Sequence, residues 1–83
     1  MELNRLRWAS RRGMLELDLV LLPFVEQVYA TLSADDQARF DALLESEDQD
    51  LFRWFLGKEI PNDEATRYIV ELVLRHTGMA AAE

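Results

Sequence analysis

With 83 residues, of which 49% are apolar, the chain has room for one thin hydrophobic core and is too apolar to be disordered. The absence of cysteine excludes a disulfide-held secreted scaffold, so we expect a cytoplasmic domain held by packing alone. A net charge of −7 excludes most of the surface as a site for nucleic acid or anionic lipid. Only residues 1–12 are cationic, with four arginines against one glutamate.

Helix-terminating residues divide the chain into five short helices, and no segment alternates apolar and polar residues as a strand would. We therefore predict an all-α fold, a compact bundle of five short helices, in one domain over residues 1–83. Residues 1–3 and 78–83 are expected to fray. The first twelve residues are polar, with no apolar core, so we expect no signal peptide. The apolar run at residues 19–22 is far shorter than the ~20 residues of a membrane span, so we expect no membrane insertion.

The first helix is predicted over residues 4–12, with Asn4 as its N-cap. Gly13 stands where a left-handed residue would close this helix. The second helix is predicted over residues 14–30. Its expected buried stripe has helical spacing and consists of Leu17, Val20, Leu21, Phe24, Val25 and Val28.

Further leucines make the second helix apolar on more than one side. Leu15, Leu19 and Leu22 occupy a side away from the main stripe, so we expect this helix to lie at the centre of the bundle. Pro23 removes a backbone donor and clashes with the carbonyl group four residues earlier, which predicts a kink or a break in the helix.

Capping residues mark the last three helices. Ser33 and Asp36 form a capping box that opens the third helix, which is expected to bury Phe40, Leu43 and Leu44. The fourth helix begins within residues 46–50, where acids complement the helix dipole, and is expected to end at Gly57. Its expected apolar stripe is Leu51, Trp54 and Phe55.

The fifth helix follows an extended Ile60-Pro61 pair and is predicted to begin after Asn62, as N-cap, and to end at Gly78. Its expected inward stripe is Ala65, Tyr68, Ile69, Leu72, Val73 and His76.

Residues that could carry catalysis or bind a metal are few. One histidine and no cysteine exclude the usual zinc ligand sets, and the acidic run at residues 45–50 lacks the glycine of a calcium loop. His76 is interpreted as a packed or capping residue. No glycine-rich phosphate loop is present. Trp54 and Phe55 have the spacing of core residues, which argues against a base-stacking surface. The sequence therefore favours a binding module over an enzyme.

The junction between the first two helices is the candidate working surface. Arginine and tryptophan are typical of interface hot spots, and glycine lets another backbone approach closely. The same residue types also suit an ordinary helix–helix turn, so structural and binding interpretations stay equally open from the residues alone. The candidate partner-binding residues are Trp8, Arg11, Arg12, Gly13, Met14 and Glu16.

The segment Arg12-Gly13-Met14-Leu15-Glu16 resembles the Arg-Gly-x-x-Glu motif of the succinate dehydrogenase assembly factor family, the FAD assembly factors known in bacteria as SdhE or YgfY. The sequence around it is also similar to that family: Trp8-Ala9 precedes the motif, Leu17-Asp18 and Pro23-Phe24 follow it, and Asp50-Leu51 precedes Trp54. The similarity extends over residues 6–76. We expect no mitochondrial transit segment, as in the bacterial members of the family.

The resemblance implies that the chain binds the flavoprotein subunit of succinate dehydrogenase, and of the related fumarate reductase, and promotes covalent attachment of FAD to a histidine of that subunit. It implies that Arg12, Gly13 and Glu16 contact the client near its flavin. The chain would then need no catalytic residue and no cofactor of its own, because the client holds the FAD. We expect it to act as a monomer that favours the client conformation in which histidine and flavin are aligned.

Two other functions stay open at this point. One is an acidic helical regulator of antitoxin type, unrelated to flavin, which would mask a basic partner. The other is a flavin transferase that binds FAD itself, although the absence of a phosphate loop argues against it.

Overall fold

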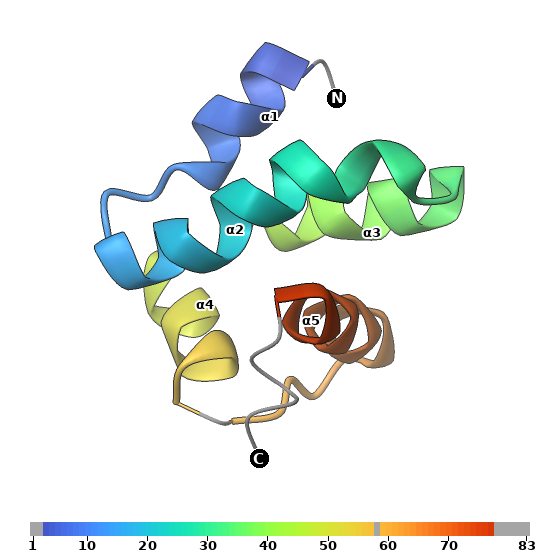
Figure 1. The fold of residues 1–83 in the computed structure, drawn as a ribbon. Coiled ribbons are helices and arrows are strands. Elements are labelled where there is room, and N and C mark those ends of the chain that lie inside the picture. Colours follow the sequence, from blue (N-terminus) through green and yellow to red (C-terminus); the bar gives the residue numbers. More distant parts are fainter. Residues whose placement is uncertain (1–2, 58, 78–83) are drawn as a thin grey trace.

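The computed structural model describes residues 3–57 and 59–77. In this part of the chain there are five α-helices and a single 3₁₀ turn, and no strand, so the predicted all-α fold is confirmed (Figure 1). The elements in chain order are α1 (Leu3–Ser10), α2 (Leu15–Gln27), η1 (Tyr29–Thr31), α3 (Ala34–Leu43), α4 (Asp48–Phe55) and α5 (Glu64–Thr77).

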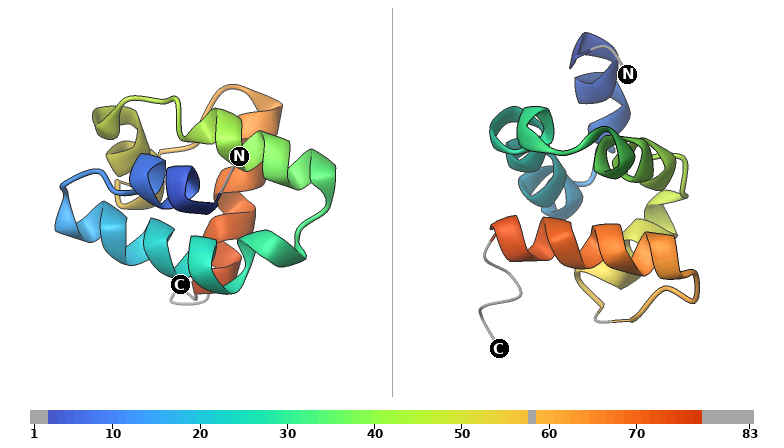
Figure 2. Two further views of the ribbon diagram at one scale, coloured as in Figure 1. Left: turned by 90° about the horizontal axis from the view of Figure 1, so that it is seen from above. Right: turned by 90° about the vertical axis from the view of Figure 1, so that its right-hand side faces the viewer.

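The core is built around α2, as its apolar sequence predicts. This helix packs against α1, α4 and α5, and α5 crosses beneath both α2 and α3 (Figure 2). α1 lies on the opposite side of α2 from α5 (Figures 1 and 2). Five of the six predicted stripe residues of α2 are buried, and Val28 is half-buried. The buried five are Leu17, Val20, Leu21, Phe24 and Val25.

α2 differs from its prediction at its end, and of the kink or break predicted at Pro23 the break does not occur. The helix ends at Gln27, because the chain tightens into η1, where the N–H groups of Thr31 and Leu32 donate to the carbonyl groups three residues earlier. Pro23 lies inside the helix without breaking it. The carbonyl that loses its partner belongs to Leu19, whose side chain faces solvent, so water can serve it.

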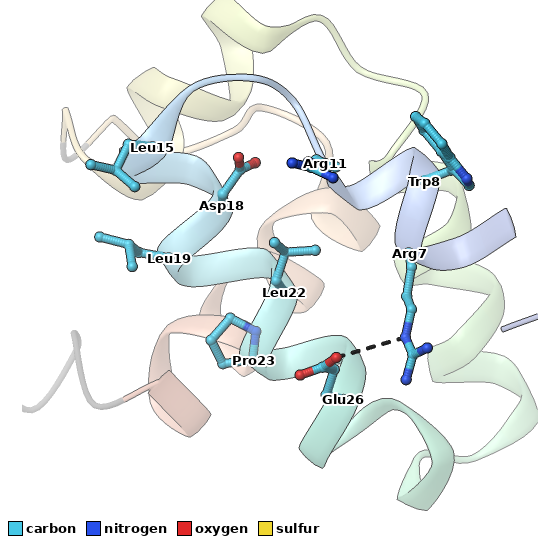
Figure 3. A pocket seen from close by; sticks show the side chains of 9 residues that line it. All are labelled: Arg7, Trp8, Arg11, Leu15, Asp18, Leu19, Leu22, Pro23 and Glu26. Atoms are coloured by element: carbon cyan, nitrogen blue, oxygen red, sulfur yellow. Dashed lines mark ion pairs between the residues drawn. The ribbon is translucent and has the colours of Figure 1, made fainter. Parts of the chain in front are cut away.

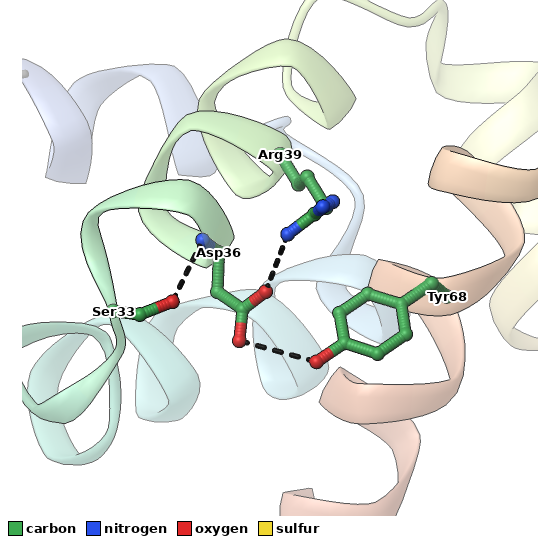
Figure 4. A network of polar contacts seen from close by, with 4 residues as sticks. All are labelled: Ser33, Asp36, Arg39 and Tyr68. Carbon is green, nitrogen blue, oxygen red and sulfur yellow. Dashed lines mark hydrogen bonds and ion pairs between the residues drawn. The ribbon is translucent and has the colours of Figure 1, made fainter.

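The capping box predicted for α3 holds only in its Ser33 half, because the Asp36 carboxylate accepts from Arg39 and Tyr68 instead, and the caps of α1 and α5 differ from their predictions. The hydroxyl of Ser33 accepts a hydrogen bond from the backbone N–H of Asp36 (3.2 Å; Figure 4). Asn4, predicted as an N-cap, lies inside α1, which begins at Leu3. The cap of α5 is Asp63 rather than Asn62, because the Asp63 carboxylate accepts from both the backbone N–H and the hydroxyl of Thr66, at 2.9 and 3.0 Å. These hydrogen bonds lower the pKa of Asp63.

Gly57 follows α4, as predicted, and its backbone comes close to that helix. A Cβ atom at Gly57 would lie 2.9 Å from the carbonyl oxygen of Arg53, so a side chain there would push the backbone of residue 57 away from α4. α3 and α4 bury Phe40, Leu43, Leu51 and Phe55 at the positions the stripes predicted, and Trp54 is half-buried against the core.

The buried face of α5 is rotated from its predicted position. Ile69, Val70 and Val73 are buried, whereas Ala65, Tyr68 and His76 are exposed. The reason is that α5 packs against α2 and α3 together, which favours a face centred on adjacent positions 69 and 70. His76 nevertheless contacts the core, because the centroid of its ring lies 6.0 Å from that of Phe24. The predicted helix end at Gly78 lies outside the described residues.

Candidate functional site

The connection between α1 and α2, with the first turn of α2, forms a corner of the molecule, here residues 11–16. α1 was predicted to run to Arg12, but it ends at Ser10. The physical reason lies in the next two N–H groups. That of Arg11 is shared between the carbonyl groups of Arg7 (3.1 Å) and Trp8 (3.2 Å). That of Arg12 leaves the helical pattern and donates to the carboxylate of Asp18 in α2 (2.9 Å).

Gly13 has the left-handed backbone predicted for it, with φ of 77°. It is not the residue that directly closes α1, because Arg11 and Arg12 stand between it and the end of the helix. A Cβ atom at this position would meet no other atom within 4 Å. Glycine is therefore favoured at this position by its backbone conformation and not by a lack of space. The space beside Gly13 is open to a partner.

Arg12 points into the protein. Its guanidinium donates a hydrogen bond to the carbonyl oxygen of Leu44, the C-cap of α3, and forms an ion pair with Asp48 in the first turn of α4 (3.6 Å). The side chain is only 17% exposed. A cation suits the carbonyl end of α3 because that end carries the negative pole of the helix dipole. Arg12 thus fastens the corner to the α3–α4 connection.

The other predicted site residues divide into an outer and an inner set. Trp8, Arg11 and Glu16 are exposed around the corner, and Met14 is half-buried against the core. Met14 is also the N-cap of α2, with extended backbone and no side-chain cap bond. Within the described residues, neither Arg11 nor Glu16 has an ion-pair partner. Five of the six predicted residues therefore lie in the corner and Trp8 lies before it in α1, and the side chains of Trp8, Arg11 and Glu16 are exposed.

A groove lies beside the corner, between α1 and the solvent side of α2, with a volume of about 620 Å³ (Figure 3). Leu15, Leu19, Leu22 and Pro23 follow one another along its α2 wall (Figure 3). The ion pair between Arg7 and Glu26 (3.7 Å) joins the two helices across it. The remaining lining residues are Trp8, Arg11 and Asp18.

α2 is central as predicted, but the side of the helix that carries Leu15 and Leu19 is not covered by the bundle. Leu15 is 70% exposed and Leu19 is 65% exposed, because α1, α4 and α5 cover other sides of α2. Sequence reasoning missed both as candidate site residues. A signal was present, because a helix that is apolar nearly all round has more apolar surface than so short a chain can bury.

Within residues 3–57 and 59–77, no three His, Asp or Glu side chains converge as metal ligands would. None of the helices in that part of the chain is long and apolar enough to cross a membrane.

A five-helix bundle with an outward-facing corner and an adjoining apolar groove defines a small protein-binding module. Residues 4–77 match the family described as "Flavinator of succinate dehydrogenase", and the chain belongs to this family. The resemblance carried by the Arg12–Glu16 motif is thereby confirmed.

Curated relatives agree with this assignment and carry the name "FAD assembly factor SdhE". The protein of that name from Pseudomonas aeruginosa is 58% identical over 73 residues, which cover 88% of this chain and 87% of the relative. That from Shewanella oneidensis is 51% identical over 87% of this chain and 89% of its own length. That from Serratia is 45% identical over 83% of this chain and 78% of its own length.

Proposed function

We propose that this chain is a cytoplasmic assembly factor that binds the flavoprotein subunit of succinate dehydrogenase, and of fumarate reductase, and promotes covalent attachment of FAD to a client histidine. Family membership supports the assembly function. The observation that carries the site is the corner itself: Gly13 leaves open space beside an exposed backbone, and the carboxylate of Glu16 has no partner in the described residues. No finding favours the antitoxin-like alternative.

In this proposal the residues of the corner have different tasks. Glu16, Arg11 and Trp8 face outward and contact the client, and Gly13 lets the client backbone come close. Arg12 acts through its neighbours: its guanidinium is bound to the carbonyl of Leu44 and to Asp48, so it holds the corner in shape. Met14 packs beneath the corner and fixes the start of α2.

The chemistry of bond formation belongs to the client histidine and the flavin ring of FAD, which the client holds. The factor binds as a monomer and supplies no nucleophile. It stabilises the client conformation in which the two reacting groups are aligned. A preference of about 1.4 kcal/mol for that conformation enriches it tenfold, which is within the range of a modest interface.

Glu16 provides the sharpest test, because an exposed side chain with no partner in the described residues contributes little to stability. Apo flavoprotein subunit and FAD are mixed with the wild type, with Glu16→Ala, or with the matched control Glu71→Ala, an exposed acid on α5. After denaturation, flavin fluorescence on the client band measures covalent attachment. We expect wild type and Glu71→Ala to accelerate attachment alike, and Glu16→Ala to lose most of the effect at an unchanged urea midpoint.

The proposal fails if wild-type protein gives no increase over a reaction without it. If Glu16→Ala is as active as wild type, the corner is not the client-binding site, although the assembly function itself would stand. Titration of FAD into the isolated protein tests where the cofactor resides, and we expect no saturable binding.

A further inference from the structure

Exposed apolar side chains gather at the groove between α1 and α2. Six large apolar side chains are exposed in the described part of the chain, and three of them line this groove. Trp8 is 76% exposed on the α1 side, and Leu15 and Leu19 are exposed on α2. A contiguous exposed apolar surface on a small soluble protein is typical of an interaction site.

The spacing of the α2 residues gives the groove a defined shape. Leu15, Leu19 and Leu22 stand four and three residues apart and therefore share one face of the helix, which Pro23 extends (Figure 3). The Arg7–Glu26 ion pair bridges the two walls farther along α2. The apolar strip thus begins at the corner, at Leu15, and continues along α2 away from it.

The charges of the groove select the partner. Arg7 is paired with Glu26, and Asp18 already accepts the N–H of Arg12. Arg11 and Asp18 are then the lining charges without an ion-pair partner among the described residues, and of the two only the side chain of Arg11 has no hydrogen bond either. In a protein with net charge −7, an exposed unpaired arginine at the rim of an apolar groove favours an acidic ligand.

We propose that this groove binds an apolar segment of the flavoprotein client that carries a carboxylate opposite Arg11. This inference rests on the proposed function and extends the client contact from the corner along the exposed face of α2. A second copy of the chain is a poorer occupant, because two molecules that each carry −7 repel one another.

The apolar contact is tested with the variant Leu15→Gln/Leu19→Gln and the matched control Ile60→Gln. Ile60 is as exposed as Leu15 but lies in the loop between α4 and α5, at the end of the molecule away from α1 (Figures 1 and 2). Calorimetric titration into apo flavoprotein subunit gives the dissociation constant. We expect the double variant to bind at least about tenfold more weakly, since each leucine loses its burial, with an unchanged urea midpoint. The control should bind like wild type.

The acidic contact is tested with Arg11→Gln and its control Arg75→Gln, an exposed arginine on α5. Each removes one positive charge. We expect Arg11→Gln to weaken binding at low salt and to flatten its salt dependence, because the local ion pair is lost. Arg75→Gln should leave the salt dependence as it is.

The outcomes separate this inference from the proposed function. If wild type binds and promotes attachment of FAD while the leucine variant binds equally well, the groove inference is overturned and the proposed function stands. If wild type neither binds nor promotes attachment, both fall. Concentration-dependent dimers in sedimentation that the leucine variant abolishes would assign the groove to a second copy and overturn the inference.

Discussion

The backbone N–H of Arg12 donates a hydrogen bond to the carboxylate of Asp18, 2.9 Å away, and so joins the end of α1 to the first turns of α2. The bond takes the Arg12 N–H away from the helical pattern of α1 and sets the path of the chain into Gly13. The orientation of the outward residues of the corner therefore depends on a carboxylate outside the Arg-Gly-x-x-Glu motif.

Asp18→Ala removes this acceptor and leaves the Arg12 N–H without its partner. We expect the free energy of unfolding to fall by about 1–2 kcal/mol, as for the loss of a charged hydrogen bond at a helix start, and attachment of FAD to slow. Asp18→Asn keeps an oxygen in the same place and should recover most of both. Urea unfolding and the flavin fluorescence assay measure the two effects. Equal behaviour of the Ala and Asn variants would contradict this role.

The variant Ser33→Ala is a control for the Asp18 variants, because it should lower the stability of the protein at a position outside the corner. It removes the cap that accepts the Asp36 N–H at the start of α3 (Figure 4), so we expect a cost of about 1 kcal/mol. Because Ser33 lies outside the proposed binding surface, attachment of FAD should continue at the wild-type rate below the unfolding range. A large loss of activity in Ser33→Ala would mean that stability alone explains the Asp18 variants.

Substitutions at Gly13 distinguish backbone strain within the protein from steric blocking of the client. Gly13→Asn should cost little, since asparagine adopts left-handed backbone more readily, whereas Gly13→Ala should cost about 1–2 kcal/mol. Gly13→Arg should also fold, because its Cβ meets nothing within 4 Å, yet it should obstruct the client. Urea midpoints and client dissociation constants distinguish these effects. A folded Gly13→Arg protein that still promotes attachment would remove Gly13 from the site.

Ser10 is fully buried at the end of α1, and its hydroxyl has no hydrogen-bond partner in the described part of the chain. Ser10→Ala removes a buried polar group that is not satisfied, so we expect the free energy of unfolding to rise by about 1 kcal/mol. Chemical denaturation at neutral pH measures the change. Destabilisation by this substitution would show that the hydroxyl does have a partner in solution.

The raised pKa of Tyr29 predicts how the stability of the protein responds to alkaline pH. Burial, and then the hydrogen bond of its hydroxyl to Asp41 (2.9 Å), raise the pKa of Tyr29 from 10.0 to about 12. A pKa that is higher in the folded state gives a stability contribution that is complete below pH 10 and declines as pH rises towards 12. The free energy of unfolding should therefore fall across this interval, and less steeply in Tyr29→Phe. Parallel slopes for the two proteins would contradict the assignment.

The helices were predictable because their ends and stripes are local properties. Ser33 caps α3 through a residue three positions away, and the α2 stripe follows from spacing alone. Contacts between distant segments were not predictable in this way. The carbonyl that binds Arg12 belongs to Leu44, 32 positions away, so the sequence could suggest a working arginine but not the direction of its side chain.

The exposed leucines show the same limit. Spacing places Leu17 and Leu19 on different sides of α2, but both sides are apolar, and only the packing of α1, α4 and α5 decides which one is buried. The buried face of α5 differs from its prediction for the same reason: Val70 is buried and His76 exposed because α2, α3 and α4 together cover that element.

The two sides of α2 are consequently subject to separate constraints during evolution. Substitutions at Leu17 or Leu21 act on folding, because these side chains are fully buried. Substitutions at Leu15 or Leu19 leave the core intact, so only the shape of the partner that binds in the groove limits them. A lineage could thus follow changes in its partner by exchanging a few solvent-facing residues on one helix, without having to restore a damaged fold.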